Sequence, residues 1–235
     1  MDFQGQGAKL RQLINLRHQP VAISFLPSAP DGVKRVDRPG PAGCSYWKLA
    51  AEGNTFYTEA SDHFECTVGA FTHGITLPEH KGKELESLIG TMVQLGYIKA
   101  EEIPEMPRRS EAFGIAVYSP LADAPANPDV VIVRGNPRQV MLVAEAARSA
   151  GIAHAGEMLG RPACTMIPQA INTAQGNASL GCIGNRVYTE LEEGELYYTL
   201  PGLRLGDVVG ELEKIVHANE ELEKFHAAKQ ASFSI

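Results

Sequence analysis

Residues 20–25 read PVAISF and residues 128–133 read PDVVIV, and these two short apolar runs decide the expected fold. Short runs rich in valine and isoleucine are typical of buried strands, and a proline that cannot donate a ladder hydrogen bond is tolerated at the start of a strand. We therefore expect one strand in each run. Similar motifs follow both runs, which indicates that the chain contains two related halves.

These motifs form a degenerate internal repeat of cysteine, helical stretch, A-x-G-N turn, short extended run, then a second cysteine followed closely by glycine. The cysteines are Cys44 and Cys66 in the first half and Cys164 and Cys182 in the second. The repeat is imperfect, because the two cysteine pairs differ in separation by four residues and the helix after residue 136 has no counterpart before Cys44. We interpret it as a gene duplication, with halves of about 8–100 and 113–205. We predict that the halves pack about a pseudo-twofold axis.

Local patterns predict the remaining elements. Apolar residues at helical spacing, together with capping and stop residues, predict helices over 8–17, 45–51, 82–97, 137–150 and 207–229. Further strands are expected at 54–60, 113–118 and 130–133, and the β-rich runs on either side of residues 192–194 predict a hairpin over 186–200. The expected fold class is α/β, mixed α+β, in a single domain over 1–205 that is followed by an amphipathic helix and tail over 206–235.

The composition bounds the class of protein. The chain has 235 residues, a formal net charge of −7 and 44% hydrophobic residues, which is typical of an ordinary globular protein. An acidic balance argues against nucleic acid or an anionic membrane as a partner. The first twenty residues contain no signal-like apolar stretch, and no segment has the length of a membrane span. We therefore expect a cytoplasmic protein with reduced cysteines.

The four cysteines are the candidate metal ligands. Gly43, Gly69, Gly181 and Gly184 lie beside them, and glycine lets backbone N–H groups turn toward a thiolate and lets a bulky group approach. Four thiolates suit zinc or an iron–sulfur cluster. Because the cysteines are dispersed rather than paired as C-x-x-C, we favour a [4Fe-4S] cluster held between the two halves over a structural zinc site with four cysteine ligands.

Other interpretations of these residues stay open. Cysteine is often a buried filler, the even number allows disulfides, and His63 or His73 could activate Cys66 as a nucleophile. Arg186 could neutralise an anionic cluster or bind a substrate carboxylate, or it could be a surface residue. The alternative class is a metal-free small-molecule binding module with a pocket between the halves. The chain has no Walker A or strand-linked dinucleotide motif, so nothing predicts a nucleotide site.

Together the motifs are similar to a known family. The strand PVAISF, the A-x-G turn beyond Cys44, and the sequences ECTVG (65–69), PACTMIP (162–168) and SLGCIGNR (179–186) resemble the bacterial and archaeal family called domain of unknown function 169. The resemblance extends from about Leu10 to Leu203. It implies a small prokaryotic domain in which cysteines at these four positions recur, and it implies no activity.

The resulting hypothesis is a cytoplasmic iron–sulfur protein with a redox role or a catalytic role on a small molecule. Four cysteine ligands favour electron transfer, whereas an iron with an open position is what substrate catalysis needs. The expected partner is a redox protein or a small molecule. The final helix is expected to pack on the body or on a second copy of the chain.

Overall fold

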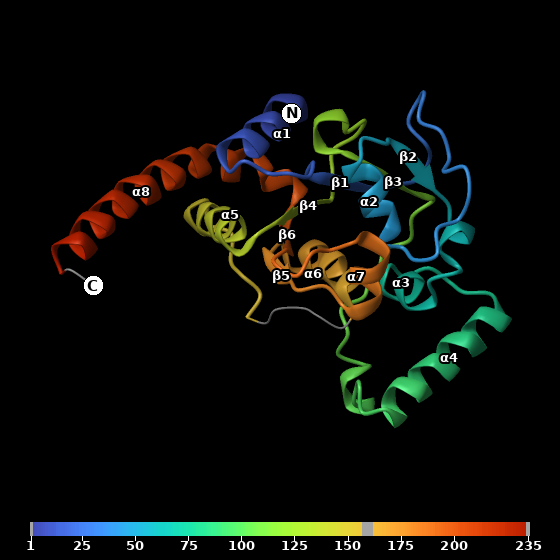
Figure 1. Ribbon diagram of the computed structural model, residues 1–235. Helices are drawn as coiled ribbons and strands as arrows, with labels where there is room; N and C mark the ends of the chain where they lie inside the picture. Colours follow the sequence, from blue (N-terminus) through green and yellow to red (C-terminus); the bar gives the residue numbers. More distant parts are fainter. Residues whose placement is uncertain (1, 157–161, 234–235) are drawn as a thin grey trace.

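The computed structural model describes residues 2–156 and 162–233. Strands and helices are intermixed, which confirms the mixed α+β class (Figure 1). In order, the helices and strands are α1 (Phe3–Leu13), β1 (Val21–Leu26), α2 (Ser45–Ala51), β2 (Phe56–Thr58), α3 (Thr67–Thr72), α4 (Glu79–Gln94), β3 (Ile115–Pro120), β4 (Val130–Gly135), α5 (Pro137–Ser149), α6 (Met166–Thr173), β5 (Asn177–Ser179), α7 (Ile183–Thr189), β6 (Leu196–Pro201) and α8 (Leu205–Ser232).

The described strands form one sheet in the order β2-β3-β1-β4-β6-β5, and each pair of neighbours is antiparallel. A loop residue forms an isolated parallel β-bridge at each edge of the sheet. Arg35 pairs with Tyr57 of β2, and His154 pairs with Gly176, which directly precedes β5. The centre of the sheet is the β1–β4 pair, which aligns only three residues of each strand, whereas β1–β3 and β4–β6 each align six. The sheet therefore consists of two longer units joined at a short central pair.

The elements of the two halves correspond in order. Apart from α5 in the second half and α4 in the first, each half runs through a long strand, a short helix, a three-residue edge strand, a second short helix and a second long strand. The strand order is the same from either edge. Val21 pairs with Pro120 as Val130 pairs with Pro201, so Ile23 and Ile132 occupy equivalent positions. This correspondence is what the internal repeat predicts. The pseudo-twofold axis itself stays a prediction.

Helices cover both faces of the sheet. Helices α1, α5 and α8 pack on one face, against side chains such as Val131 and Leu200. Helices α2 and α6 pack on the other face, against side chains such as Ile23 and Ile132. Each large apolar side chain that is fully buried contributes about 1.5–3 kcal/mol. Because successive residues of a strand point to opposite faces, the continuous apolar runs in β1 and β4 serve both cores.

Most of the expected helices and strands are confirmed with shifted ends, but the hairpin over 186–200 is wrong. Its first run forms helix α7, and only β6 is a strand. At the start of α7 the Cys182 sulfur accepts a hydrogen bond from the Asn185 backbone N–H at 3.4 Å. Asn185 and Thr189, four residues apart, are both buried on the inner face of this helix. This helical spacing outweighs the β propensity of the intervening valine and tyrosine.

Helix α3 is not expected from the sequence. The connection that follows α3 is much longer than the corresponding connection in the second half. Between α3 and β3 the chain has 42 residues, 73–114, whereas between α7 and β6 it has six, 190–195. The longer connection contains α4, which projects from the body in Figure 1. Of the residues of α4, only Leu85 is buried.

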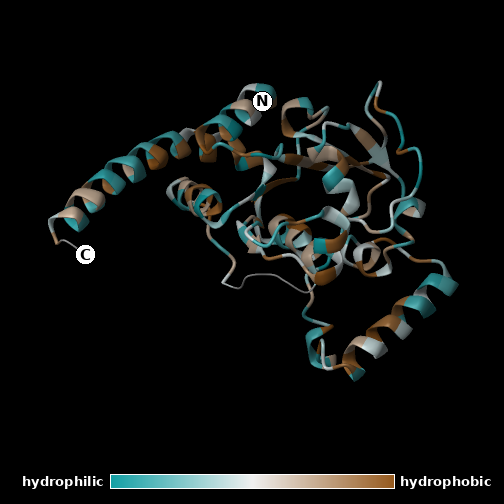
Figure 2. Ribbon diagram, in the orientation of Figure 1, coloured by the Kyte–Doolittle hydropathy of each residue, from teal (hydrophilic) through white to brown (hydrophobic). Residues whose placement is uncertain are grey.

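The last helix packs on the body only over its first part. Val208, Val209 and Leu212 are buried, whereas Leu222 and Phe225 of the same predicted stripe are 55% and 61% exposed. The outer part of α8 extends away from the body (Figures 1 and 2). Among the described helices, none is long and apolar enough to cross a membrane.

Candidate functional site

The four cysteines lie at the starts of four short helices. Cys44 directly precedes α2, and Cys164 lies in the 3₁₀ turn that leads into α6. Cys66 and Cys182 are the N-cap residues of α3 and α7. The cysteines therefore occupy corresponding places in the two halves, as the repeat predicts. Cys44 and Cys164 are buried, and Cys66 and Cys182 are half-buried.

All four cysteines line one cavity of about 370 Å³. The cavity brings together residues from both halves, because Cys44 and Cys66 belong to the first and Cys164 and Cys182 to the second. Its remaining described lining is mostly apolar: Ala42, Gly43, Val68, Gly69, Phe71, Leu85, Leu88, Ile89, Met92, Tyr97, Ile98, Ile103, Met106, Pro162, Ala163, Ile183, Gly184, Asn185 and Tyr188. No Asp, Glu, Lys, Arg or His occurs among these described residues.

The thiols are close enough to influence one another's ionisation. Burial, followed by the Coulombic effect of Cys66, raises the pKa of Cys44 to about 12. The same two causes, in the same order, raise the pKa of Cys164 well above its ordinary value. Both of these thiols are therefore protonated at neutral pH, and a bound cation would be needed to stabilise their thiolates.

Two buried hydroxyl groups, those of Thr72 and Tyr118, lie near the thiols. The Thr72 hydroxyl of the first half is 3.3 Å from the Cys164 sulfur of the second half, which gives a direct contact between the halves at the cavity. The hydroxyl of Tyr118, in β3, is buried and has no hydrogen-bond partner in the described chain. Burial raises its pKa well above the ordinary value, and Tyr46 and the thiols of Cys66, Cys164 and Cys44 add to this effect.

The glycines singled out from the sequence divide into two groups. Gly43, Gly69 and Gly184 line the cavity. A side chain at Gly69 would place its Cβ 2.8 Å from the Cys66 sulfur. Glycine at this position avoids that steric clash. Gly181 is outside the described lining and has a φ of 76°, a left-handed conformation that glycine adopts without strain. Its role is to form the turn before Cys182.

Arg186 also lies outside the described lining of the cavity. Its guanidinium donates a hydrogen bond to the Glu192 carbonyl oxygen at 3.2 Å, which connects α7 to the segment that follows it. The anion-binding role expected for Arg186 therefore gains no support from the position of this side chain.

The arrangement of the thiols bears on which metal group could bind. Within 2–156 and 162–233, no group of three or more His, Cys, Asp or Glu side chains is placed to hold a metal ion. Sulfur atoms around one zinc ion lie about 3.8 Å apart, because each Zn–S bond is about 2.3 Å in a tetrahedron. The thiols instead surround a cavity. The four thiols therefore share one cavity without forming a group of this kind among the described residues.

Two other interpretations of the cysteines can be compared with the structure. All four cysteines are free thiols, so the described chain has no disulfide. Nε2 of His63 is 2.8 Å from the Thr58 hydroxyl, whereas Nδ1 of His63 and both ring nitrogens of His73 are buried without a hydrogen-bond partner in the described chain. Neither histidine is therefore paired with Cys66 as a nucleophile would require.

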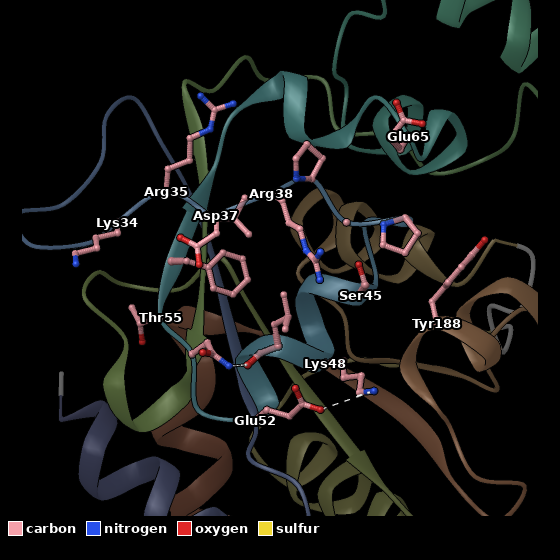
Figure 3. Close-up of a pocket in the computed structure, with 17 residues that line it drawn as sticks. Lys34, Arg35, Asp37, Arg38, Ser45, Lys48, Glu52, Thr55, Glu65 and Tyr188 are labelled. Carbon is pink, nitrogen blue, oxygen red and sulfur yellow. Dashed lines mark hydrogen bonds and ion pairs between the residues drawn. The ribbon is translucent and has the colours of Figure 1, made fainter.

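A second, larger hollow lies beside the cysteine cavity. It has a volume of about 900 Å³ and is formed by the loop 34–41, α2 and β2 (Figure 3). Its lining carries charges of both signs, and several are paired: Lys48 with Glu52 and Glu190, and Arg35 with Glu59 and Asp62. Asp62 is buried, and these carboxylates already neutralise Lys48 and Arg35 within the chain, so neither cation is set up to attract a charged ligand. The cysteine cavity is thus the stronger candidate site.

One wall of this cavity is not predicted from the sequence. Leu88, Ile89 and Met92 are predicted only to lie on the apolar face of a helix, and residues 97–106 are not predicted to line a site. The signal that could have found them is the absence of this 28-residue stretch, 79–106, from the second half of the repeat. Asn185, buried beside Cys182, is present in the quoted motif SLGCIGNR, but the motif alone assigns it no role.

The fold and the four-cysteine cavity define a class of small α+β proteins that have a cysteine-lined pocket between corresponding halves. The profile of the DUF169 family, described as "Uncharacterised ArCR", matches residues 9–211, and the chain belongs to this family. It is 25% identical over 224 residues to "Uncharacterized protein MJ0308" of Methanocaldococcus jannaschii, with 90% of this chain and 94% of that protein covered. No solved structure matches the chain.

Proposed function

We propose that the protein binds an iron–sulfur cluster of the [4Fe-4S] type through Cys44, Cys66, Cys164 and Cys182, and that it has a redox role. The observation that carries the proposal is that all four cysteines of the chain, dispersed over more than half of its length, line one cavity. Incidental thiols would have no reason to be brought together from corresponding positions of two halves.

The chemistry of the lining supports the same proposal. Soft thiolate ligands select iron–sulfur clusters, zinc and Cu(I), and an apolar surrounding keeps water away from a cluster. Close glycines leave room beside Cys44, Cys66 and Cys182 for a group larger than an ion. A cytoplasmic location, where thiols stay reduced, would keep all four ligands available.

The exposure of the cysteines supports electron transfer over a closed structural role. Cys44 and Cys164 are buried, and Cys66 and Cys182 are partly accessible. A cluster held in this way would have one side in the core and one side near the surface, where a redox partner or a small molecule could approach. Ligation by four cysteines would leave no iron with an open position, which favours electron transfer.

The test is anaerobic expression and purification, followed by iron and sulfide assays and a visible absorption spectrum. We expect equimolar iron and sulfide and a spectrum that is bleached by dithionite. Replacing any one cysteine by serine should lower the iron content more than about tenfold. Ser87→Ala, on the exposed face of α4, is the matched control and should keep the wild-type iron content.

Two results would contradict the proposal. A folded, colourless protein that contains no iron would leave the metal-free small-molecule binding module as the better hypothesis. A protein that contains one zinc ion per chain in place of iron would establish the structural zinc alternative.

A further inference from the structure

The cavity has two walls of different origin. One wall is made by the body, where the cysteines lie. The other comes from the excursion of the chain between α3 and β3, residues 75–108, which we call the cap. The cap supplies the apolar side chains Leu85, Leu88, Ile89, Met92, Ile98, Ile103 and Met106 and the aromatic ring of Tyr97.

The two ends of the cap meet where the chain leaves and re-enters the body, at Thr72–Gly74 and Arg109, and we call this point the neck. The Arg109 backbone N–H donates to the Thr72 carbonyl oxygen at 2.9 Å, so the two ends of the excursion lie side by side. Gly74 has a φ of 76°, and a Cβ there would be 2.4 Å from the Arg109 carbonyl oxygen, so the neck requires glycine. The Arg109 guanidinium stacks over Phe25 and Phe113 at 4.7 and 5.1 Å, which anchors the neck to the body.

The cap contributes little to the two cores, although it is rich in apolar residues. Leu85 is the one residue of α4 that is buried, and the other cap side chains that face the cavity are half-buried or exposed. Figure 2 shows the brown, apolar part of α4 on the projecting helix. A folded segment of this kind gains little from its apolar side chains unless something covers them.

Apolar exposure continues on the body side of the cavity. Ile183 is 69% exposed and Tyr188 is 42% exposed, and both line the cavity together with Leu88 of the cap, which is 39% exposed. A molecule seated between α4 and α7 would cover all three side chains. Because removing apolar surface from water is favourable, this contact favours an apolar molecule.

We propose that the cap and the cysteine wall enclose a binding chamber for a neutral, mainly apolar small molecule. The size of the cavity, about 370 Å³, lies in the range of small-molecule sites. The described lining offers no charged side chain to pair with an anion or a cation, and burying an unpaired charge is costly. Asn185 and Tyr188 supply the few polar contacts that orient a ligand.

The chamber does not depend on the cluster, because its apolar wall belongs to the cap and its cysteine wall is present in either case. With a cluster bound at the cysteines, the two would share the cavity, and the ligand would take the part that the cap lines. Without a cluster, the chamber would be the binding site of the metal-free module. The test therefore measures ligand binding and iron content separately.

The probes are para-fluorotoluene and para-fluorobenzoate, two molecules of similar shape that differ in charge, observed by fluorine NMR with the anaerobically purified protein. We expect para-fluorotoluene to bind and para-fluorobenzoate to bind at least about tenfold more weakly. Equal binding of the two probes, or binding of neither, would overturn the proposed ligand class.

The matched variants are Ile89→Glu and Leu95→Glu, which place the same charge at the two positions, one within α4 and one directly after it. Ile89 lines the cavity, whereas Leu95 is 78% exposed and lies outside the described lining. Ile89→Glu should weaken para-fluorotoluene binding more than about tenfold, and Leu95→Glu should leave it unchanged. Equal binding by the two variants would show that the probe binds elsewhere.

Iron content separates this proposal from the proposed function. Ile89 is not a proposed ligand, so both variants should hold as much iron as the wild type. Iron-free protein that still binds para-fluorotoluene in the chamber would remove the cluster proposal and retain this one. Iron-loaded protein that binds neither probe would do the reverse. Circular dichroism of each variant checks that it is folded.

Discussion

The body wall and the cap wall of the cavity are built in opposite ways. The body wall comes from short helices of both halves, which pack on a sheet whose central side chains are almost fully buried. The cap wall comes from one half alone and is joined to the body through a narrow neck. The corresponding elements of the two halves therefore supply the cysteines, whereas the cap, which occurs in the first half alone, supplies much of the apolar surface of the cavity.

The largest effect should come from the two equivalent core positions, Ile23 and Ile132. Their side chains are 0% and 2% exposed in the same core. Ile23→Ala and Ile132→Ala should each lower the free energy of unfolding by about 2–5 kcal/mol, because each leaves a cavity in the core. Urea denaturation measures both. A difference of more than about 2 kcal/mol would show that the halves do not share the core equally.

The loss of stability at low pH should come from two buried histidines of the first half, His63 and His73. Burial lowers the pKa of His63 to about 4, and burial followed by the Coulombic effects of His63 and Arg109 lowers the pKa of His73 to about 3. As pH falls below about 6.5, the unfolded chain takes up protons that the folded chain does not, so stability is full above this pH and is lost below it. As the pH falls from 6.5 to 5, each histidine should lower the free energy of unfolding by about 2 kcal/mol.

Urea denaturation at a series of pH values tests this expectation. His73→Asn should flatten the dependence on pH, because the substituted side chain does not titrate. Thr189 lies seven residues after Cys182, as His73 lies seven residues after Cys66. Thr189→Ala is therefore the control for the second half and should leave the slope unchanged. An unaltered slope in His73→Asn would show that His73 is not a source of the sensitivity.

Removing the cap should change stability less. Replacing residues 76–107 by a short glycine linker is compatible with the closed neck between Thr72 and Arg109. The loss of Leu85 burial, about 1.5–3 kcal/mol, is opposed by the conformational entropy that the cap no longer loses on folding. We expect the free energy of unfolding to change by less than about 2 kcal/mol. Thermal and urea unfolding measure the change. A truncated chain that showed no cooperative unfolding transition would contradict this expectation.

The smallest effect should come from the contact that joins the halves at the cavity. Thr72→Val keeps the shape of the side chain and removes the hydroxyl that lies beside the Cys164 sulfur and donates to the Gly69 carbonyl oxygen, which should cost about 1 kcal/mol. Thr91→Val, on the exposed surface of α4, is the matched control and should stay within about 0.5 kcal/mol of the wild type. Equal stability of the two variants would indicate that the buried contact contributes nothing to folding.

Much of the fold could be predicted from local patterns. The capped helix α5 and the apolar strands β1 and β4 each have a signal that does not depend on distant residues, and Asn136 accepts the Gln139 N–H as a helix N-cap should. The prediction for α7 is wrong because its valine and tyrosine favour strands, whereas its actual conformation depends on the burial of Asn185 and Thr189.

The candidate site could be predicted in part. The repeat predicts four cysteines near one another, and they do line one cavity. The cap wall could not be found in the same way, because the placement of α4 over the cavity depends on the hydrogen bond at the neck and on the stacking of Arg109, which are contacts between residues far apart in sequence. The position of Arg186 depends equally on a partner, Glu192, that its own motif does not contain.

The two edges of the sheet have a consequence for how copies of this chain can meet. The edge strands β2 and β5 have three residues each. Tyr57 exchanges backbone hydrogen bonds with the loop at Lys34 and Val36, and Gly176 does so with the loop at Ala153 and Ala155. Short and covered edges offer little template for another strand, so the sheet resists growth into an aggregate by strand addition. Association of two copies would then involve helical surfaces such as the outer part of α8.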